Sequence, residues 1–153
     1  MPTVLWILLG SGIATLSLQA QVVPTQANID AQAQRRLQED ARESLRRRRI
    51  DENVRTLVPA LDANRLAGPD GLAITRQSMA AFADLQDFQI LPQDAVKLAQ
   101  KKSSLDPSQV KSTSAYLLSC WDLAAGKLTS DDLALLRQGL APKTKVDWPP
   151  FSP

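Results

Sequence analysis

The chain has 153 residues, a length typical of one domain, and its formal net charge of +2 is too nearly balanced to indicate a nucleic-acid partner. Histidine is absent and Cys120 is the single cysteine. This composition excludes an internal disulfide, histidine metal ligands and the Ser–His and Cys–His nucleophile pairs of hydrolases. Glycine-rich nucleotide-binding motifs and a nucleophile elbow are also missing, so we expect no enzyme, no cofactor and no metal site.

Aromatic residues make up only 5% of the chain, and apolar and polar residues seldom alternate. This pattern predicts an all-α protein whose core is built from Leu, Ala, Val and Ile. The predicted parts are an apolar leader or membrane anchor (1–20), a long Arg-rich helix (21–58), a small domain of about four short helices (59–140) and an extended Pro- and aromatic-containing tail (141–153). No segment resembles a particular protein family closely enough to identify it.

Residues 4–18 form the only strongly apolar run of the chain and contain no charged residue. A helix that spans a bilayer needs about 20 apolar residues, whereas a secretory leader needs only about 7 to 15, followed by a small residue at the cut. Cleavage after Ala20, a retained membrane anchor and an apolar arm docked in protein therefore stay open as alternatives. The residues expected in the membrane or at the centre of a leader are Leu5, Trp6, Ile7, Leu8 and Leu9.

The first basic residues bear on the side of the membrane at which the protein lies. No Lys or Arg precedes Arg35, so the chain lacks the basic start that a leader normally has. By the positive-inside rule, a retained anchor would leave the rest of the chain in the cytoplasm, whereas a cleaved leader would export it. We expect an exported or membrane-associated protein and favour the extracytoplasmic side, with a cytoplasmic-facing anchor as the alternative.

One long polar helix is predicted over residues 26–57, which contain neither Gly nor Pro. Its apolar residues recur every fourth position, a spacing that gives a narrow stripe that drifts around the helix instead of a broad core-facing side. The members of this row are Ile29, Ala33, Leu37, Ala41 and Leu45. We therefore expect much of the helix circumference to face water or a partner.

Arginine is concentrated in this helix, with eight Arg against five acidic residues between Arg35 and Arg55. Ion pairs four residues apart are expected to stabilise an exposed helix by about 0.2–0.5 kcal/mol each. The expected pairs are Arg35–Glu39, Arg36–Asp40, Glu43–Arg47, Arg48–Glu52 and Asp51–Arg55. The consecutive Arg46, Arg47, Arg48 and Arg49 point all round a helix, so the neighbouring acids cannot neutralise them all. A solvated, ion-paired helix and a surface for an anionic partner both stay open.

The small domain is predicted from helix start and stop signals. Pro at a first helical position, Thr or Asp at an N-cap and Gly after a last turn mark the boundaries. The predicted helices are 75–88 with Thr75 as its N-cap, a short helix opened by residues 91–94, 107–125, and 131–138. The third has the best apolar face, and Cys120 within it is expected to be a buried, unreactive thiol. The acidic pair Asp131 and Asp132 is interpreted as helix capping instead of acid–base chemistry.

The tail, residues 141–153, ends in Trp-Pro-Pro-Phe-Ser-Pro and is predicted to be extended. Trp148 and Phe151 on such a segment either dock in a groove of a partner or fold back over their own domain, and the sequence favours neither.

Taken together, the apolar leader, the Arg-rich helix and the aromatic tail are elements that gain burial only against something else. We therefore expect a non-catalytic structural subunit of a larger, membrane-associated protein assembly. Its membrane contact would be residues 4–18 if the leader is retained. The candidate partner contacts are Arg46, Arg47, Arg48, Arg49, Leu37, Leu45, Trp148 and Phe151. The alternatives are a free exported helical binding protein and a binder of anionic lipid or nucleic acid through residues 42–49.

Overall fold

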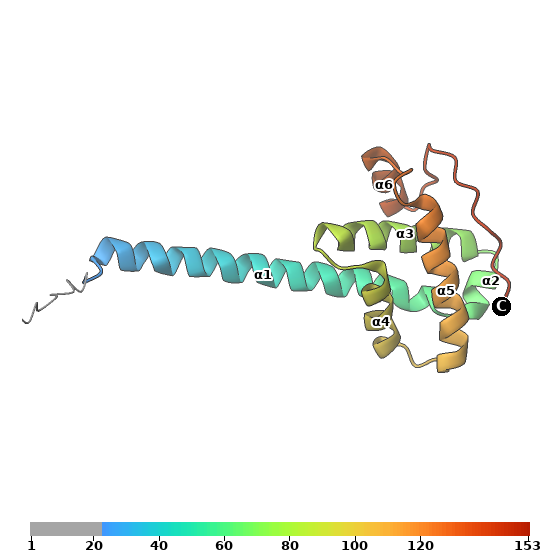
Figure 1. The fold of residues 1–153 in the computed structure, drawn as a ribbon, viewed down its shortest axis with the longest axis horizontal. Helices are drawn as coiled ribbons and strands as arrows, with labels where there is room; N and C mark the ends of the chain where they lie inside the picture. The colour runs from blue at the N-terminus through green and yellow to red at the C-terminus, as the bar shows by residue number, and fades with distance from the viewer. Residues whose placement is uncertain (1–22) are drawn as a thin grey trace, which may run out of the picture. The chain divides into compact units, whose positions relative to one another are not determined.

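The computed structural model describes residues 23–153, and this part of the chain is all-helical (Figure 1). It contains six α-helices and no strand, which confirms the predicted all-α class. The helices are α1 (Gln26–Ala60), α2 (Ala63–Ala67), α3 (Gly71–Asp87), α4 (Pro92–Lys102), α5 (Pro107–Ala124) and α6 (Ser130–Arg137). The predicted leader, with Leu5 to Leu9, lies outside the described residues.

The chain divides into two units, residues 1–37 and 38–153. In the described part of the first unit, residues 23–37, α1 begins at Gln26 and every residue is exposed. The tertiary packing described below belongs to the second unit.

The core of the second unit is built around α3, which packs against α2, α4, α5 and α6. Its side chains Met79, Phe82 and Leu85 are fully buried, and Phe82 meets Trp121 of α5 edge to face with ring centroids 5.8 Å apart. Such a contact stabilises the core beyond the burial of the two rings. The end of α1 adds Leu57 to the same core.

Helix α3 begins at Gly71, four residues before the predicted N-cap, so the prediction for Thr75 is wrong. Thr75 is a buried interior residue whose Oγ1 donates to the carbonyl of Gly71 at 2.9 Å. The glycine is required by close packing, because a Cβ at position 71 would lie 1.9 Å from the carbonyl oxygen of Leu66 in α2. The early start therefore depends on a contact between two helices, which a local capping signal does not report.

The starts of the last three helices follow their local signals. Pro92 and Pro107 occupy first-turn positions of α4 and α5, and the carboxylate of Asp106 caps α5 by accepting from the Ser108 amide at 3.0 Å. Thr129 and Asp132 form a reciprocal capping box at the start of α6. Helices α5 and α6 begin and end within one residue of their predicted bounds.

Helix α1 runs past its predicted end at residue 57 and includes Pro59 before it stops at Ala60. Proline lacks an amide hydrogen, so Pro59 cannot make the usual bond to the carbonyl four residues earlier, and the helix ends one residue later.

Candidate functional site

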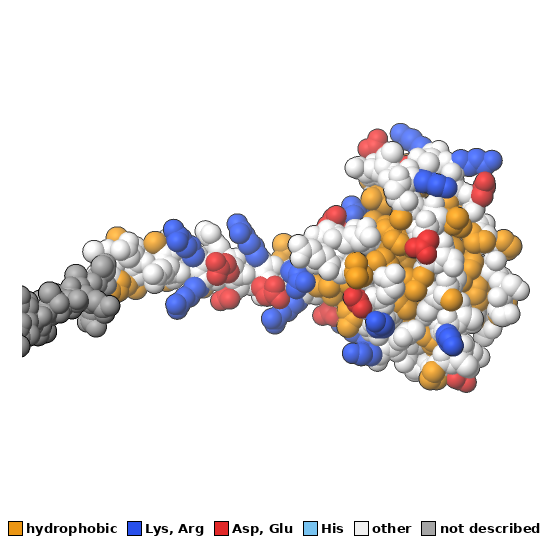
Figure 2. Space-filling model, in the orientation of Figure 1, with side chains coloured by type: hydrophobic (Ala, Val, Ile, Leu, Met, Phe, Trp, Pro, Cys, Tyr) orange, Lys and Arg blue, Asp and Glu red, His pale blue; other side chains and the backbone are white. Residues whose placement is uncertain are grey.

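The first candidate site is the exposed α1 segment, residues 26–45. None of its residues is buried, and Leu37 and Leu45 keep 69% and 58% of their surface exposed. Acidic and basic side chains are distributed along α1 (Figure 2). Because these residues are exposed, the apolar side chains of this segment have no cover within the described chain. Among the described residues, no helix combines the length and hydropathy that crossing a bilayer requires.

The four consecutive arginines divide into two kinds. Arg46 Nη2 donates to the carbonyl of Phe88, the residue that follows α3, at 3.4 Å. Arg49 Nη2 donates to Asp84 Oδ1 within α3, at 3.2 Å. Among the residues that the structure describes, Arg47 pairs only with Glu43 of its own helix, at 3.0 Å. Two of the four predicted contact arginines thus contact the domain, whereas among the described residues Arg47 and Arg48 have no ion pair with it.

The ion pairs along α1 differ from the predicted set. Of the five expected pairs, the structure contains only Glu43–Arg47, while Arg46 also approaches Glu43 and Arg49 approaches Glu52, each at 3.7 Å. Asp51 pairs with Lys102 of α4 at 2.7 Å, and this hydrogen bond lowers the pKa of the Asp51 carboxyl. Tertiary neighbours therefore compete with the local four-residue spacing.

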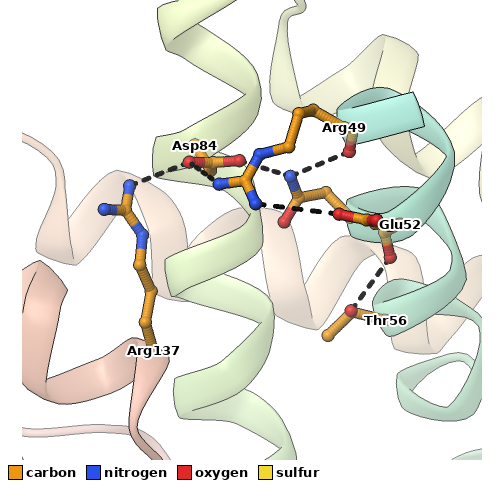
Figure 3. A network of polar contacts seen from close by, with 6 residues as sticks. Arg49, Glu52, Thr56, Asp84 and Arg137 are labelled. Atoms are coloured by element: carbon orange, nitrogen blue, oxygen red, sulfur yellow. Dashed lines mark hydrogen bonds and ion pairs between the residues drawn. The ribbon is translucent and has the colours of Figure 1, made fainter. Parts of the chain in front are cut away.

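A buried carboxylate joins three helices in the second candidate site (Figure 3). Asp84 of α3 has 9% of its side chain exposed and accepts from Arg49 of α1 and from Arg137 of α6, the latter at 3.1 Å. Asn53 of α1 donates to its other oxygen at 2.5 Å and to the carbonyl of Arg49 at 3.0 Å. Three donors compensate the Asp84 carboxylate for the hydration that it loses on burial, so this network holds α1, α3 and α6 together.

Beside this network lies a depression of about 430 Å³. Its polar lining includes Thr56 and Gln77 together with the Asp84 network, and its apolar floor is Ala80, Ala81 and Leu136. Asp84, Asn53 and Arg137 could not be predicted as a site from the sequence, because residues 31 to 53 positions apart carry no local signal that they meet. Within residues 23–153, no three His, Cys, Asp or Glu side chains are grouped closely enough to hold a metal ion.

The tail is attached to α6 through Asp132. The buried Asp132 carboxylate accepts from the backbone amides of Lys143 at 2.7 Å and of Thr144 at 3.1 Å, and also from the Thr144 hydroxyl. These bonds favour the ionised form, and the Thr144 hydroxyl in particular lowers the pKa of Asp132 well below its usual range. The interpretation of Asp132 as a capping residue accounts for its bonds to Thr129, while its role as anchor of the tail was not predicted.

Further along, the tail packs on α5. The Tyr116 hydroxyl donates to the carbonyl of Pro149 at 2.5 Å, and the Tyr116 ring meets Phe151 edge to face at 5.0 Å. Trp148 and Phe151 are partly buried against the core. Burial raises the pKa of Tyr116 to about 12. Of the two interpretations of the tail, the structure therefore has the one in which it folds back on its own domain.

Cys120 is fully buried in α5, as expected, and burial raises the pKa of its thiol. A protonated, covered thiol does not act as a nucleophile, and it takes part in neither candidate site.

No protein-family model matches the chain, and no curated protein or solved structure matches it significantly.

Proposed function

We propose that this protein is a non-catalytic structural subunit of a larger, membrane-associated assembly, and that the exposed α1 segment is its contact surface. The observation that carries the proposal is the exposure of all residues from 26 to 45 within one helix. Most of the stability of helices in proteins comes from the packing of an apolar face. A partner that covers this segment would supply that packing.

The tail does not share this role. Trp148 and Phe151 contact α5 and the core of their own domain, so they are satisfied without a partner. Arg46 and Arg49 are likewise occupied by α3 and the residue that follows it. Of the predicted contact residues, Leu37, Leu45, Arg47 and Arg48 remain, and all four lie on α1 within 12 positions of one another.

Membrane association rests on the sequence of residues 4–18, which are uncharged and apolar. In this proposal they attach the subunit to the bilayer, and the exposed α1 segment binds a neighbouring subunit close to the membrane surface.

The test is recovery of the full-length tagged chain from its native membranes in mild detergent, with identification of the proteins that accompany it. A subunit predicts one or a few defined chains, a second copy of this chain counted among them, in fixed stoichiometry with the tagged wild-type chain, and their loss when Leu37 and Leu45 are both replaced by Asp. The matched control is Leu123→Asp, because Leu123 is an exposed leucine of α5 with 43% of its surface exposed.

The control variant should keep the accompanying proteins, and all variants should keep the circular dichroism spectrum of the wild type. Recovery of the wild-type chain as a monomer without other proteins, or of the same complex with the double variant, would contradict the proposed contact surface.

A further inference from the structure

We infer that the exposed α1 segment pairs with the same segment of a second copy of this chain, in antiparallel orientation about a two-fold axis at the level of Glu39. This inference rests on the proposed function, because it names the occupant of the contact surface given there. It follows from the helical repeat of α1 together with the charges and contacts of four residues.

Four exposed residues of α1 lie along one line of the helix surface. Asp30, Leu37, Ala41 and Arg48 are separated by seven, four and seven positions, and all four are exposed. At about 100° per residue, a step of seven turns the helix back by about 20° and a step of four turns it forward by about 40°. The four side chains therefore stay within about 20° of a common line, which we call the contact strip.

The order of residues in the contact strip is self-complementary. A second strip that runs in the opposite direction places Asp30 opposite Arg48 of the second copy and Leu37 beside Ala41 of the second copy. Each contact then occurs twice, as an isologous two-fold interface requires. The large Leu37 meets a small Ala41, which lets the two helices approach, and each end of the strip closes with an ion pair.

The parallel arrangement lacks this match. It would place Asp30 against Asp30 and Arg48 against Arg48 of the second copy, and like charges in contact oppose association. The order acid, leucine, alanine, arginine thus selects one orientation.

Asp30 and Arg48, the charged ends of the contact strip, make few contacts with other described residues. Asp30 accepts one hydrogen bond, from Gln26 Nε2 at 3.0 Å, and is in no ion pair of the described chain. Arg48 has no ion pair among the described residues, because its expected partner Glu52 pairs with Arg49 instead, at 3.7 Å. Both side chains are therefore available to a second copy.

The experiment is sedimentation equilibrium of the purified full-length chain in a density-matched mild detergent. We expect a monomer–dimer equilibrium. Asp30→Arg alone and Arg48→Asp alone should each raise the dimer dissociation constant by about tenfold, because each turns two attractive pairs into repulsive ones. The double variant Asp30→Arg/Arg48→Asp should restore the wild-type constant, because both pairs return with their signs exchanged.

Orientation is tested by disulfide formation in a Cys120→Ala background. Asp30→Cys and Arg48→Cys chains produced together should form a linked dimer, and neither chain alone should do so. A linked dimer of the Asp30→Cys chain alone, a lack of rescue in the double variant, or a monomer at all concentrations would overturn the inference. Because the purified chain contains no other protein, a monomer there would leave the co-purification test of the proposed function unaffected.

Discussion

Helix α1 has two parts with the same secondary structure and different surroundings. Residues 26–45 are all exposed, whereas Val54, Leu57 and Ala60 near its end are buried in the core. The spacing of the apolar residues accounts for this difference. Val54, Leu57 and the buried Leu61 follow one another after three and four positions, which keeps them on one face, whereas a strict spacing of four turns a row by about 40° at each step. The comparison teaches that a helix can be well formed along its whole length and still need a partner for one part of it.

The largest expected effect comes from matched leucine truncations in the two parts of this helix. Leu57 has no exposed surface, so Leu57→Ala should lower the free energy of unfolding by about 2–5 kcal/mol through lost burial and the cavity left behind. Leu37→Ala should change it by less than about 0.5 kcal/mol. Urea unfolding of the monomer, followed by circular dichroism, measures both free energies. Equal losses would show that the two parts of α1 do not differ in packing.

Removal of the buried charge that joins the packed part of α1 to its neighbours should have the next largest effect. Asp84→Asn leaves Arg49 and Arg137 without their shared counter-charge and should lower the free energy of unfolding by about 1–3 kcal/mol. Its matched control is Asp40→Asn in the exposed α1 segment, where Asp40 has no ion pair among the described residues. The same urea experiment should show no change for the control. If both variants were equally stable, Asp84 would not hold the helices together.

A smaller effect tests whether the tail belongs with the packed part of the molecule. Tyr116→Phe removes the hydrogen bond to the Pro149 carbonyl and should lower the free energy of unfolding by about 1 kcal/mol, measured by urea unfolding.

Tyr116 is the single tyrosine, so the phenolate absorbance of the wild type reports this residue alone. Its titration midpoint should lie near 12 instead of 10. Because the folded-state pKa of Tyr116 is raised, the stabilisation that its protonated hydroxyl contributes is present below about pH 10 and is lost as the pH rises toward 12. A midpoint at the ordinary value would contradict the burial of the Tyr116 hydroxyl.

The smallest expected effect is a change in acid sensitivity at the other end of the tail. The pKa of Asp132 is lowered in the folded chain, so its stabilisation is present above its ordinary value of about 4 and is lost as the pH falls below that value. Asp132→Asn cannot ionise, so its melting temperature should fall less steeply than that of the wild type between about pH 5 and pH 3. Parallel curves would show that the carboxylate does not anchor the tail.

Local signals in the sequence predicted much of the fold. Pro92, Pro107 and the capping residue Thr129 act within one turn, so the starts of α4, α5 and α6 could be found without knowledge of their neighbours. The start of α3 could not, because Gly71 is placed by its approach to Leu66 in another helix.

The candidate sites divide in the same way. The exposed leucines Leu37 and Leu45 were predicted from periodicity on a single helix. Asp84 was missed because Arg49 and Arg137 reach it from distant parts of the chain. The tail could not be assigned to its own domain from sequence, since Trp148 and Phe151 would suit an internal groove and a partner equally well.

The most direct test of the proposed contact surface compares two cysteines on opposite faces of the same helix. Leu37 and Glu39 are both exposed in the structure and are separated by about 200° around α1. The native Cys120 is buried and gives little background. Labelling with a maleimide in gently broken native cells should be slow for Leu37→Cys and fast for Glu39→Cys, and dilution of the purified chain should remove the difference. Equally fast labelling of both cysteines in the native preparation would show that nothing covers this face of α1.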